Sequence, residues 1–191
     1  MPAWGAEVDI RSRDQDSLYL SHDPFAQGDD FDLWLAAFKS HGITGPLILN
    51  TKEDGLEAHC LDRLKAHGIE NFFFLDTTIP TLVRWTTKKN VAHFAVRFSR
   101  YEPLSAVMAF AGKASWVWVD CFDGVPARPE DLVELKKAFR ICVVSPELQV
   151  GVTPQQAQHI QRFWPLSPWI DAVCTKTPEL WSPGALPSRA S

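Results

Sequence analysis

The sequence contains few cysteines and no pair of them in a Cys-x-x-Cys spacing. Three of the four lie within apolar runs, where a reduced thiol packs as a small hydrophobic side chain. This usage fits a reducing cytosol and does not indicate a disulfide-bonded secreted domain. The four are Cys60, Cys121, Cys142 and Cys174.

Long hydrophobic runs and clusters of basic charge are absent as well. No apolar stretch approaches the ~20 residues that a membrane-spanning helix needs, and residues 1–7 lack the charged leader and apolar core of a signal peptide. The net charge is −4, and the nearest approach to a basic patch is the pair Lys88 and Lys89. We therefore expect a cytoplasmic protein that does not span a membrane and does not bind nucleic acid.

What the sequence does contain is a regular alternation of short apolar runs and amphipathic segments. Strand–helix repeats of this kind form parallel sheets. Because a G-x-G-x-x-G turn is absent and polar residues follow almost every strand, we predict an α/β fold of the TIM-type (β/α)8 barrel class. The predicted strands are residues 6–10, 46–49, 71–75, 93–98, 116–119, 141–144 and 171–174. The predicted helices are residues 32–40, 56–66, 81–87, 103–111, 130–138 and 154–163.

The apolar run at residues 18–21 breaks this alternation, because only residues 11–17 separate it from the first strand. That link is too short for a parallel crossover, so we expect an antiparallel hairpin partner. The other strands are one fewer than a closed barrel needs, which predicts a barrel that is incomplete at its N-terminus, with the first strand missing. We assign residues 1–181 to one barrel domain and expect the Pro- and Ser-rich residues 182–191 to be a disordered tail.

Polar side chains follow the strands, at the end where the chemistry of such barrels takes place. Glu7 and Asp9 lie on one face of their strand. If they face inward they need a cation between them, and oxygen ligands of this type suit Mg²⁺ or Ca²⁺. A pair of exposed acids at a sheet edge is an equally good interpretation.

Two further residues have a chemical and a purely structural interpretation. His22 is a candidate general acid or base, or a loop histidine that bonds to its neighbour Asp23. Lys52 can offset the charge of a phosphate, or it can pair with Glu53 or Glu57. In the second half of the chain, Arg97 and Asp120 follow neighbouring strands and can form an ion pair.

Four short motifs, in this order, resemble the glycerophosphodiester phosphodiesterase family. Its members have a Glu-x-Asp strand, a short hairpin followed by His-Asp-Pro, a Glu-x-Lys strand and a final strand with a small-Thr-Asp-x-Pro ending. The corresponding segments here are Ala6-Glu-Val-Asp-Ile-Arg11, Leu18-Tyr-Leu-Ser-His-Asp-Pro24, Leu47-Ile-Leu-Asn-Thr-Lys52 and Val173-Cys-Thr-Lys-Thr-Pro-Glu-Leu-Trp181.

The resemblance implies metal-assisted cleavage of a phosphodiester. Glu7 and Asp9 match the family's metal-binding carboxylates. His22 matches one of its two catalytic histidines, and Lys52 matches a lysine near the phosphate. Asn50 stands where a metal-binding Glu is usual; its carbonyl oxygen can still ligate a metal, with one negative charge fewer and weaker binding.

Two other departures from the family concern the last and the first strand. Lys176 stands where an Asp is common, so a cation replaces an anion on the site face. No residue matches the His-Arg that ends the family's first strand and supplies the second catalytic histidine. We expect that an upstream start was missed, and that the DNA upstream encodes an apolar strand ending in His-Arg. A strand from another chain and an open barrel are the other two explanations.

Taken together, these residues predict a phosphodiesterase-like hydrolase of glycerophosphodiester-type or other small organophosphate diesters, weakly active or inactive as this chain. The partner is then a small-molecule phosphodiester from lipid metabolism, such as a glycerol- or inositol-phosphate headgroup. The alternative is a non-catalytic barrel that binds an anionic phosphorylated sugar or headgroup through Lys52, Arg97 and Lys176. A Schiff-base aldolase that uses Lys52 or Lys176 is a third and weaker interpretation.

Overall fold

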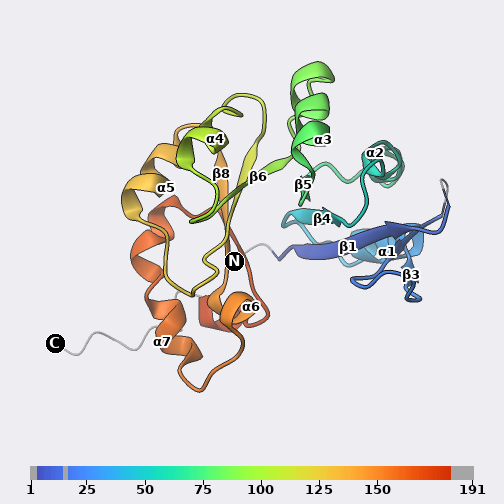
Figure 1. Ribbon diagram of the computed structural model, residues 1–191. Coiled ribbons are helices and arrows are strands. Elements are labelled where there is room, and N and C mark those ends of the chain that lie inside the picture. Colours follow the sequence, from blue (N-terminus) through green and yellow to red (C-terminus); the bar gives the residue numbers. More distant parts are fainter. Residues whose placement is uncertain (1–3, 15–16, 182–191) are drawn as a thin grey trace. The chain divides into compact units, whose positions relative to one another are not determined.

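The computed structural model describes residues 4–14 and 17–181, so the tail predicted at 182–191 lies outside the described residues. The chain divides into two compact units, Met1–Ala95 and Val96–Ser191. None of the helices in the described ranges is both long and apolar enough to cross a membrane. Figure 1 shows the helices and strands of each unit.

The first unit contains a five-stranded sheet in the order β3-β2-β1-β4-β5. Its central strands are parallel: Ala6 of β1 lies opposite Leu47 of β4, which lies opposite Phe72 of β5. Strand β2 pairs antiparallel with β1, as predicted from the short link between them, and β3 pairs antiparallel with β2. The strands are β1 (Ala6–Ser12), β2 (Leu18–Leu20), β3 (Asp29–Asp30), β4 (Leu47–Thr51) and β5 (Phe72–Leu75).

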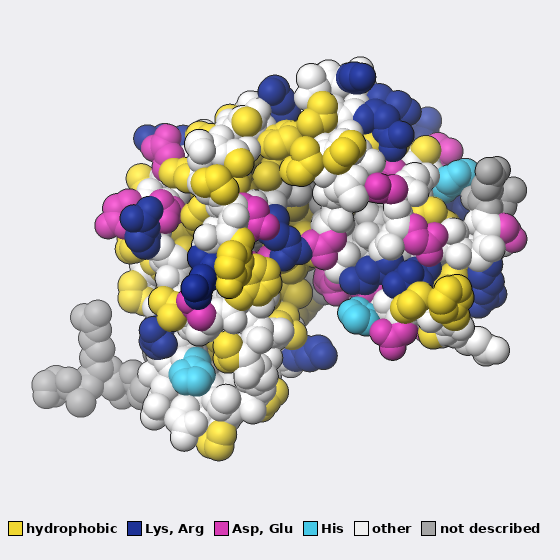
Figure 2. Space-filling view, viewed as in Figure 1, with side chains coloured by type: hydrophobic (Ala, Val, Ile, Leu, Met, Phe, Trp, Pro, Cys, Tyr) yellow, Lys and Arg dark blue, Asp and Glu magenta, His cyan; other side chains and the backbone are white. Residues whose placement is uncertain are grey.

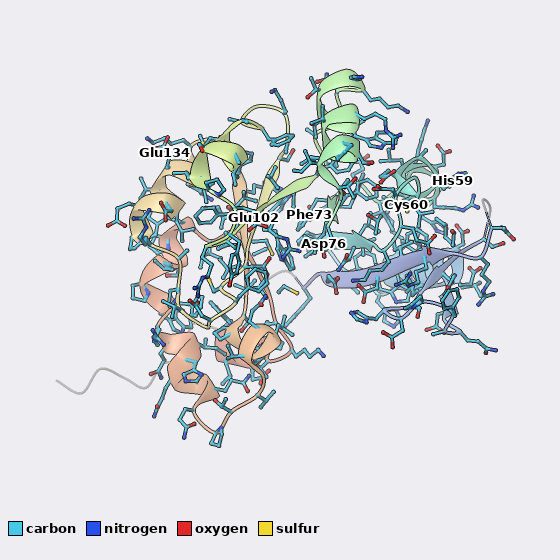
Figure 3. The ribbon with its side chains drawn as sticks, in the orientation of Figure 1. His59, Cys60, Phe73, Asp76, Glu102 and Glu134 are labelled. Atoms are coloured by element: carbon cyan, nitrogen blue, oxygen red, sulfur yellow. The ribbon has the colours of Figure 1, made fainter. Side chains whose placement is uncertain are left out.

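Helices follow these strands and bury one side each. Helix α1 begins at Phe31 and is capped by Asp30, whose side chain accepts a hydrogen bond from the Leu33 N–H at 2.9 Å. Figure 3 labels His59 and Cys60 on α2, and Phe73 and Asp76 within and directly after β5. The helices of this unit are α1 (Phe31–Ser40), α2 (Glu57–Ala66), α3 (Ile79–Val83) and the π-helix η1 (Arg84–Lys88).

The second unit contains a four-stranded sheet in the order β6-β7-β8-β9. Strands β7, β8 and β9 are parallel to one another. The strands are β6 (Ala95–Phe98), which begins at the last residue of the first unit, β7 (Trp116–Val119), β8 (Arg140–Val144) and β9 (Ala172–Cys174). The helices are α4 (Leu104–Met108), α5 (Pro129–Lys136), α6 (Pro146–Val150), α7 (Gln156–Gln161), and the 3-10 helices η2 (Trp164–Trp169) and η3 (Pro178–Trp181).

The predicted α/β class with parallel strands is confirmed, and each predicted strand is present with its ends within two residues of those predicted. The helices differ more: the one predicted at residues 103–111 ends at Met108, and the one predicted at residues 154–163 is Gln156–Gln161. The helix predicted at residues 81–87 begins earlier, at Ile79, because Pro80 is favourable in the first turn, and its second half is a π-helix. The short strand β3 and helix α6 were not predicted, because two residues and five residues are too short to show a hydrophobic period.

Candidate functional site

Two neighbouring strands of the first unit, β1 and β4, carry polar side chains that lie together. On β1, Glu7 and Asp9 are two residues apart and share one face of the sheet. Asp9 lies opposite Asn50 on β4. The N–H of Lys52 donates to the carbonyl of Ile10 at 3.0 Å, so the ladder continues past β4 and fixes the backbone of Lys52. We call Glu7, Asp9, Asn50 and Lys52 the β1–β4 cluster.

Lys52 forms an ion pair within this cluster. Its Nζ lies 2.8 Å from Oδ1 of Asp9, and the two side chains are 19% and 21% exposed. The interpretation in which Lys52 pairs with Glu53 or Glu57 is wrong, because Lys52 pairs with Asp9. Glu53 lies beside Arg11 and Glu57 beside Arg84. The lysine therefore belongs to the same site as the two carboxylates.

The other members of the cluster change the pKa of Glu7. Its burial and the negative charge of Asp9 raise the pKa of its carboxyl group. A hydrogen bond from Asn50 and the charges of Lys52 and His22 oppose this rise. Because all four side chains change the pKa of Glu7, they lie within electrostatic range of a common point.

Asn50 leaves one acceptor of the cluster without a donor. The residue is only 8% exposed, and its Oδ1 is buried with no hydrogen-bond partner. A buried acceptor without a partner is uncommon and costs free energy, unless a water or an ion satisfies it. The described residues hold no group of three or more His, Cys, Asp or Glu side chains placed for a metal. A metal at this position would therefore rely on the amide oxygen together with Glu7 and Asp9.

His22 lies in the loop that follows β2, and its side chain is 75% exposed. Its Nδ1 lies 2.9 Å from Oδ1 of Asp23, as the structural interpretation of the sequence predicted. A carboxylate only accepts hydrogen bonds, so Nδ1 carries the proton and Nε2 is the basic nitrogen of the neutral ring. Arg11 donates to the carbonyl of His22 at 3.0 Å and holds the loop against β1. The contact with Asp23 thus leaves Nε2 available for proton transfer.

The predicted ion pair between Arg97 and Asp120 is present in the second unit, where Arg97 Nη1 donates to Oδ2 of Asp120. The Asp120 side chain is only 2% exposed and accepts a second bond from Gln149 at 2.7 Å. Burial raises the pKa of Asp120, and the charge of Arg97 opposes the rise. Lys176 is exposed. The substrate-binding roles of Arg97 and Lys176 stay predictions.

Sequence reasoning missed Glu147 as the centre of a buried network in the second unit. Its carboxylate accepts hydrogen bonds from Ser145, from Thr175 at 2.5 Å and from the backbone N–H of Lys176 at 3.1 Å. In the sequence, Ser145-Pro-Glu147 comes directly after a predicted strand, a pattern that is equally typical of a helix cap. The network joins the segments that leave β8 and β9.

The fold is similar to that of a solved structure, whereas no family model and no curated protein matches the sequence. The solved structure is the crystal structure of a candidate glycerophosphodiester phosphodiesterase from Galdieria sulphuraria. The TM-score is 0.68 at 16% sequence identity, and the match covers 93% of this chain and 84% of the other. The fold thus agrees with the family that the sequence motifs resemble.

Proposed function

We propose that this chain is a metal-dependent phosphodiesterase-like hydrolase of glycerophosphodiesters or other small organophosphate diesters. The observation that supports it is the β1–β4 cluster, in which two carboxylates, a partnerless buried amide oxygen and a lysine converge. The order of the sequence motifs and the fold of the structural neighbour point to the same reaction class. We further propose that the parallel strands belong to one (β/α)8-type barrel and that the protein is cytoplasmic.

The donor set fits a divalent cation that prefers oxygen ligands. Glu7, Asp9 and Asn50 would hold Mg²⁺ or Ca²⁺, with the unsatisfied Oδ1 of Asn50 as the neutral ligand. A cation bound there would neutralise charge on the phosphoryl oxygens of the substrate. Two carboxylates give a weaker site than three would.

The other residues of the site supply a proton acceptor and a positive charge. His22 presents Nε2 as a base, because Asp23 holds the proton on Nδ1. Lys52 keeps an ammonium group beside Asp9, where it can interact with a phosphate oxygen. With a single histidine at the site, we expect slow turnover.

The alternative of a non-catalytic anion binder needs cations that are available to a ligand. Lys52 is paired with Asp9, and Arg97 is paired with Asp120. Each pair loses its attraction when an anion takes the cation away. Both pairs oppose an added anion, whether it is a substrate or a ligand, so the effect of EDTA separates the hydrolase from the binder. The ion pair of Lys52 does argue against an aldolase, whose lysine must be uncharged to attack a carbonyl.

The proposal is tested by assaying bis-p-nitrophenyl phosphate and glycerophosphodiesters with Mg²⁺, with Ca²⁺ and with EDTA. We expect metal-stimulated hydrolysis that Glu7→Gln and Asp9→Asn abolish, together with the loss of metal binding in calorimetric titration. Glu70→Gln and Asp62→Asn are the matched controls, since both side chains are exposed and lie outside the cluster. Hydrolysis, or binding of a phosphorylated sugar, that is indifferent to EDTA and to both cluster variants would refute the proposal.

A further inference from the structure

The segment that follows β5 has an uneven distribution of charge. No Asp or Glu occurs between Asp76 and Glu102, although the whole chain has a net charge of −4. In the first unit this segment forms α3 and η1, and it places Arg84, Lys88 and Lys89 on the surface. Figure 2 shows Lys and Arg side chains, in dark blue, over the part of the face where Figure 1 labels α3.

Among the residues that the structure describes, two of these three cations have no carboxylate partner. Nη2 of Arg84 lies 3.9 Å from Oε2 of the buried Glu57. Lys89 lies over the ring of Trp85, 4.3 Å from its centroid, which is a cation–π contact and leaves its charge in place. Within the described ranges, neither Lys88 nor Lys89 forms an ion pair. The segment therefore presents positive charge that the protein itself does not neutralise.

Apolar side chains are exposed on the same segment. Ile79 is 61% exposed and Val83 is 38% exposed, and a spacing of four residues puts them on one helix face. Leu82 and Trp85 are buried and attach the segment to the unit. An apolar stripe next to cations is the surface pattern of helices that lie in a membrane interface.

The π-helix is a second unusual feature at the same place. The N–H of Lys89 donates to the carbonyl of Arg84 at 3.1 Å, five residues earlier, which closes the wider turn. π-helical turns are rare and are frequently found at functional sites. The wider turn occurs at the residues that carry the unpaired charges.

We propose that the α3–η1 segment binds the surface of a membrane that contains anionic lipids. Lys88 and Lys89 face the phosphate headgroups, and Ile79 and Val83 enter the interface. A nucleic acid would use the same cations but would leave both aliphatic side chains in water, so the apolar stripe favours lipid. This inference goes beyond hydrolysis and does not depend on the β1–β4 cluster.

The test is flotation of the full chain with phosphatidylcholine vesicles that do or do not contain phosphatidylglycerol. We expect binding only to the anionic vesicles, and binding that weakens as salt increases. Lys88→Gln/Lys89→Gln should weaken it roughly 25-fold, because each cation near an anionic surface contributes a factor of about five. Ile79→Ser/Val83→Ser should weaken it as well, while circular dichroism shows an unchanged fold.

The control is Lys65→Gln/Lys113→Gln, which changes the net charge equally at exposed lysines elsewhere. This variant should bind anionic vesicles like the original chain. Absence of vesicle binding, equal binding to neutral vesicles, or an equal loss in the control would overturn the proposal. So would tighter binding to a duplex DNA oligonucleotide that depends on the lysines but not on Ile79 and Val83. Competition by free inorganic phosphate at the lipid-phosphate concentration would also overturn it, since the site would then recognise the anion and not the surface.

Discussion

Replacement of Asn50 by Asp tests the β1–β4 cluster directly, because it adds a charge at almost constant shape. Asn50 is 8% exposed and donates a hydrogen bond to Glu7. The new carboxylate would lose that bond and face two acids, with Lys52 as the nearby cation. Two unit charges about 4 Å apart repel by about 4 kcal/mol at an effective dielectric constant of ~20. Since Lys52 offsets part of this repulsion, we expect the free energy of unfolding of the metal-free variant to fall by about 2–4 kcal/mol.

A bound divalent cation should reverse the effect of the same substitution. A third carboxylate in place of the amide oxygen adds a full negative charge to the ligand set, which raises the affinity for Mg²⁺ or Ca²⁺. At a metal concentration of about 100 times Kd, binding to the native state alone adds about 2.7 kcal/mol to the free energy of unfolding. In EDTA the variant should therefore have a lower free energy of unfolding than the original chain. Addition of the metal should reduce or reverse this difference in free energy.

The measurement is urea unfolding in EDTA, Mg²⁺ and Ca²⁺, together with calorimetric titration of each metal. Asn90→Asp is the matched control, because Asn90 is exposed and lies outside the cluster; it should show neither the loss in EDTA nor the gain with metal. If Asn50→Asp is as stable as the original chain in EDTA, the carboxylates do not converge at Asn50. If it loses stability but gains no metal affinity, they converge without forming a cation site.

Three further expectations concern titration of buried groups. Burial, followed by the charge of Asp9, raises the pKa of Glu7. The native state therefore holds the proton of this carboxyl group more tightly than the unfolded state does. As a result, the free energy of unfolding falls as the pH rises from the ordinary pKa of 4.5 through the raised pKa. Glu7→Gln should remove this slope and be more stable than the original chain at neutral pH without metal; a steeper slope would refute the assignment. Burial alone would raise the pKa of Glu147, but its hydrogen bonds, of which that from Ser145 has the largest effect, lower this pKa. The ionised Glu147 therefore stabilises the native state above pH 4.5, and this stabilisation is lost as the pH falls through the lowered pKa. Glu147→Gln should cost about 1–3 kcal/mol in urea unfolding at neutral pH and little in strong acid. Burial raises the pKa of Cys121 to about 11 and that of Cys142 well above its usual range, so a thiol reagent at neutral pH should react with them only after unfolding, and rapid reaction of the native protein would contradict their burial.

The strands were predictable because most of them are buried on both faces. A run such as Phe72–Leu75, in which every residue is buried, has no polar face and stands out from its surroundings. The hairpin of β1 and β2 followed from chain length alone. The π-helix η1 was not predictable, because no sequence pattern separates a π turn from an α turn.

At the candidate site, the residue types were predictable and their partners were not. The period of a strand places Glu7 and Asp9 on one face, but only the register of β1 against β4 puts Asp9 opposite Asn50. A shift of one residue would turn Asn50 to the other face of the sheet. The sequence offered Glu53 and Glu57 as partners of Lys52 because they are close in the chain, whereas its partner lies on the neighbouring strand.

The ion pair between Lys52 and Asp9 predicts that a metal and an anion bind cooperatively. While Asp9 holds the ammonium at 2.8 Å, an incoming phosphate must break this pair. If Asp9 served as a ligand of a divalent cation, its pair with Lys52 would be weakened and Lys52 would be available to the anion. By linkage, each ligand then raises the affinity for the other by the same factor, and we expect an increase of about 5- to 20-fold for inorganic phosphate when Mg²⁺ is present. Calorimetric titration of phosphate with Mg²⁺ and with EDTA measures this increase in phosphate affinity. Lys52→Met should remove the part of the increase that depends on the lysine, and the variant should still bind Mg²⁺. Equal phosphate affinity under both conditions in the unmodified chain would show that Lys52 and the metal ligands act independently.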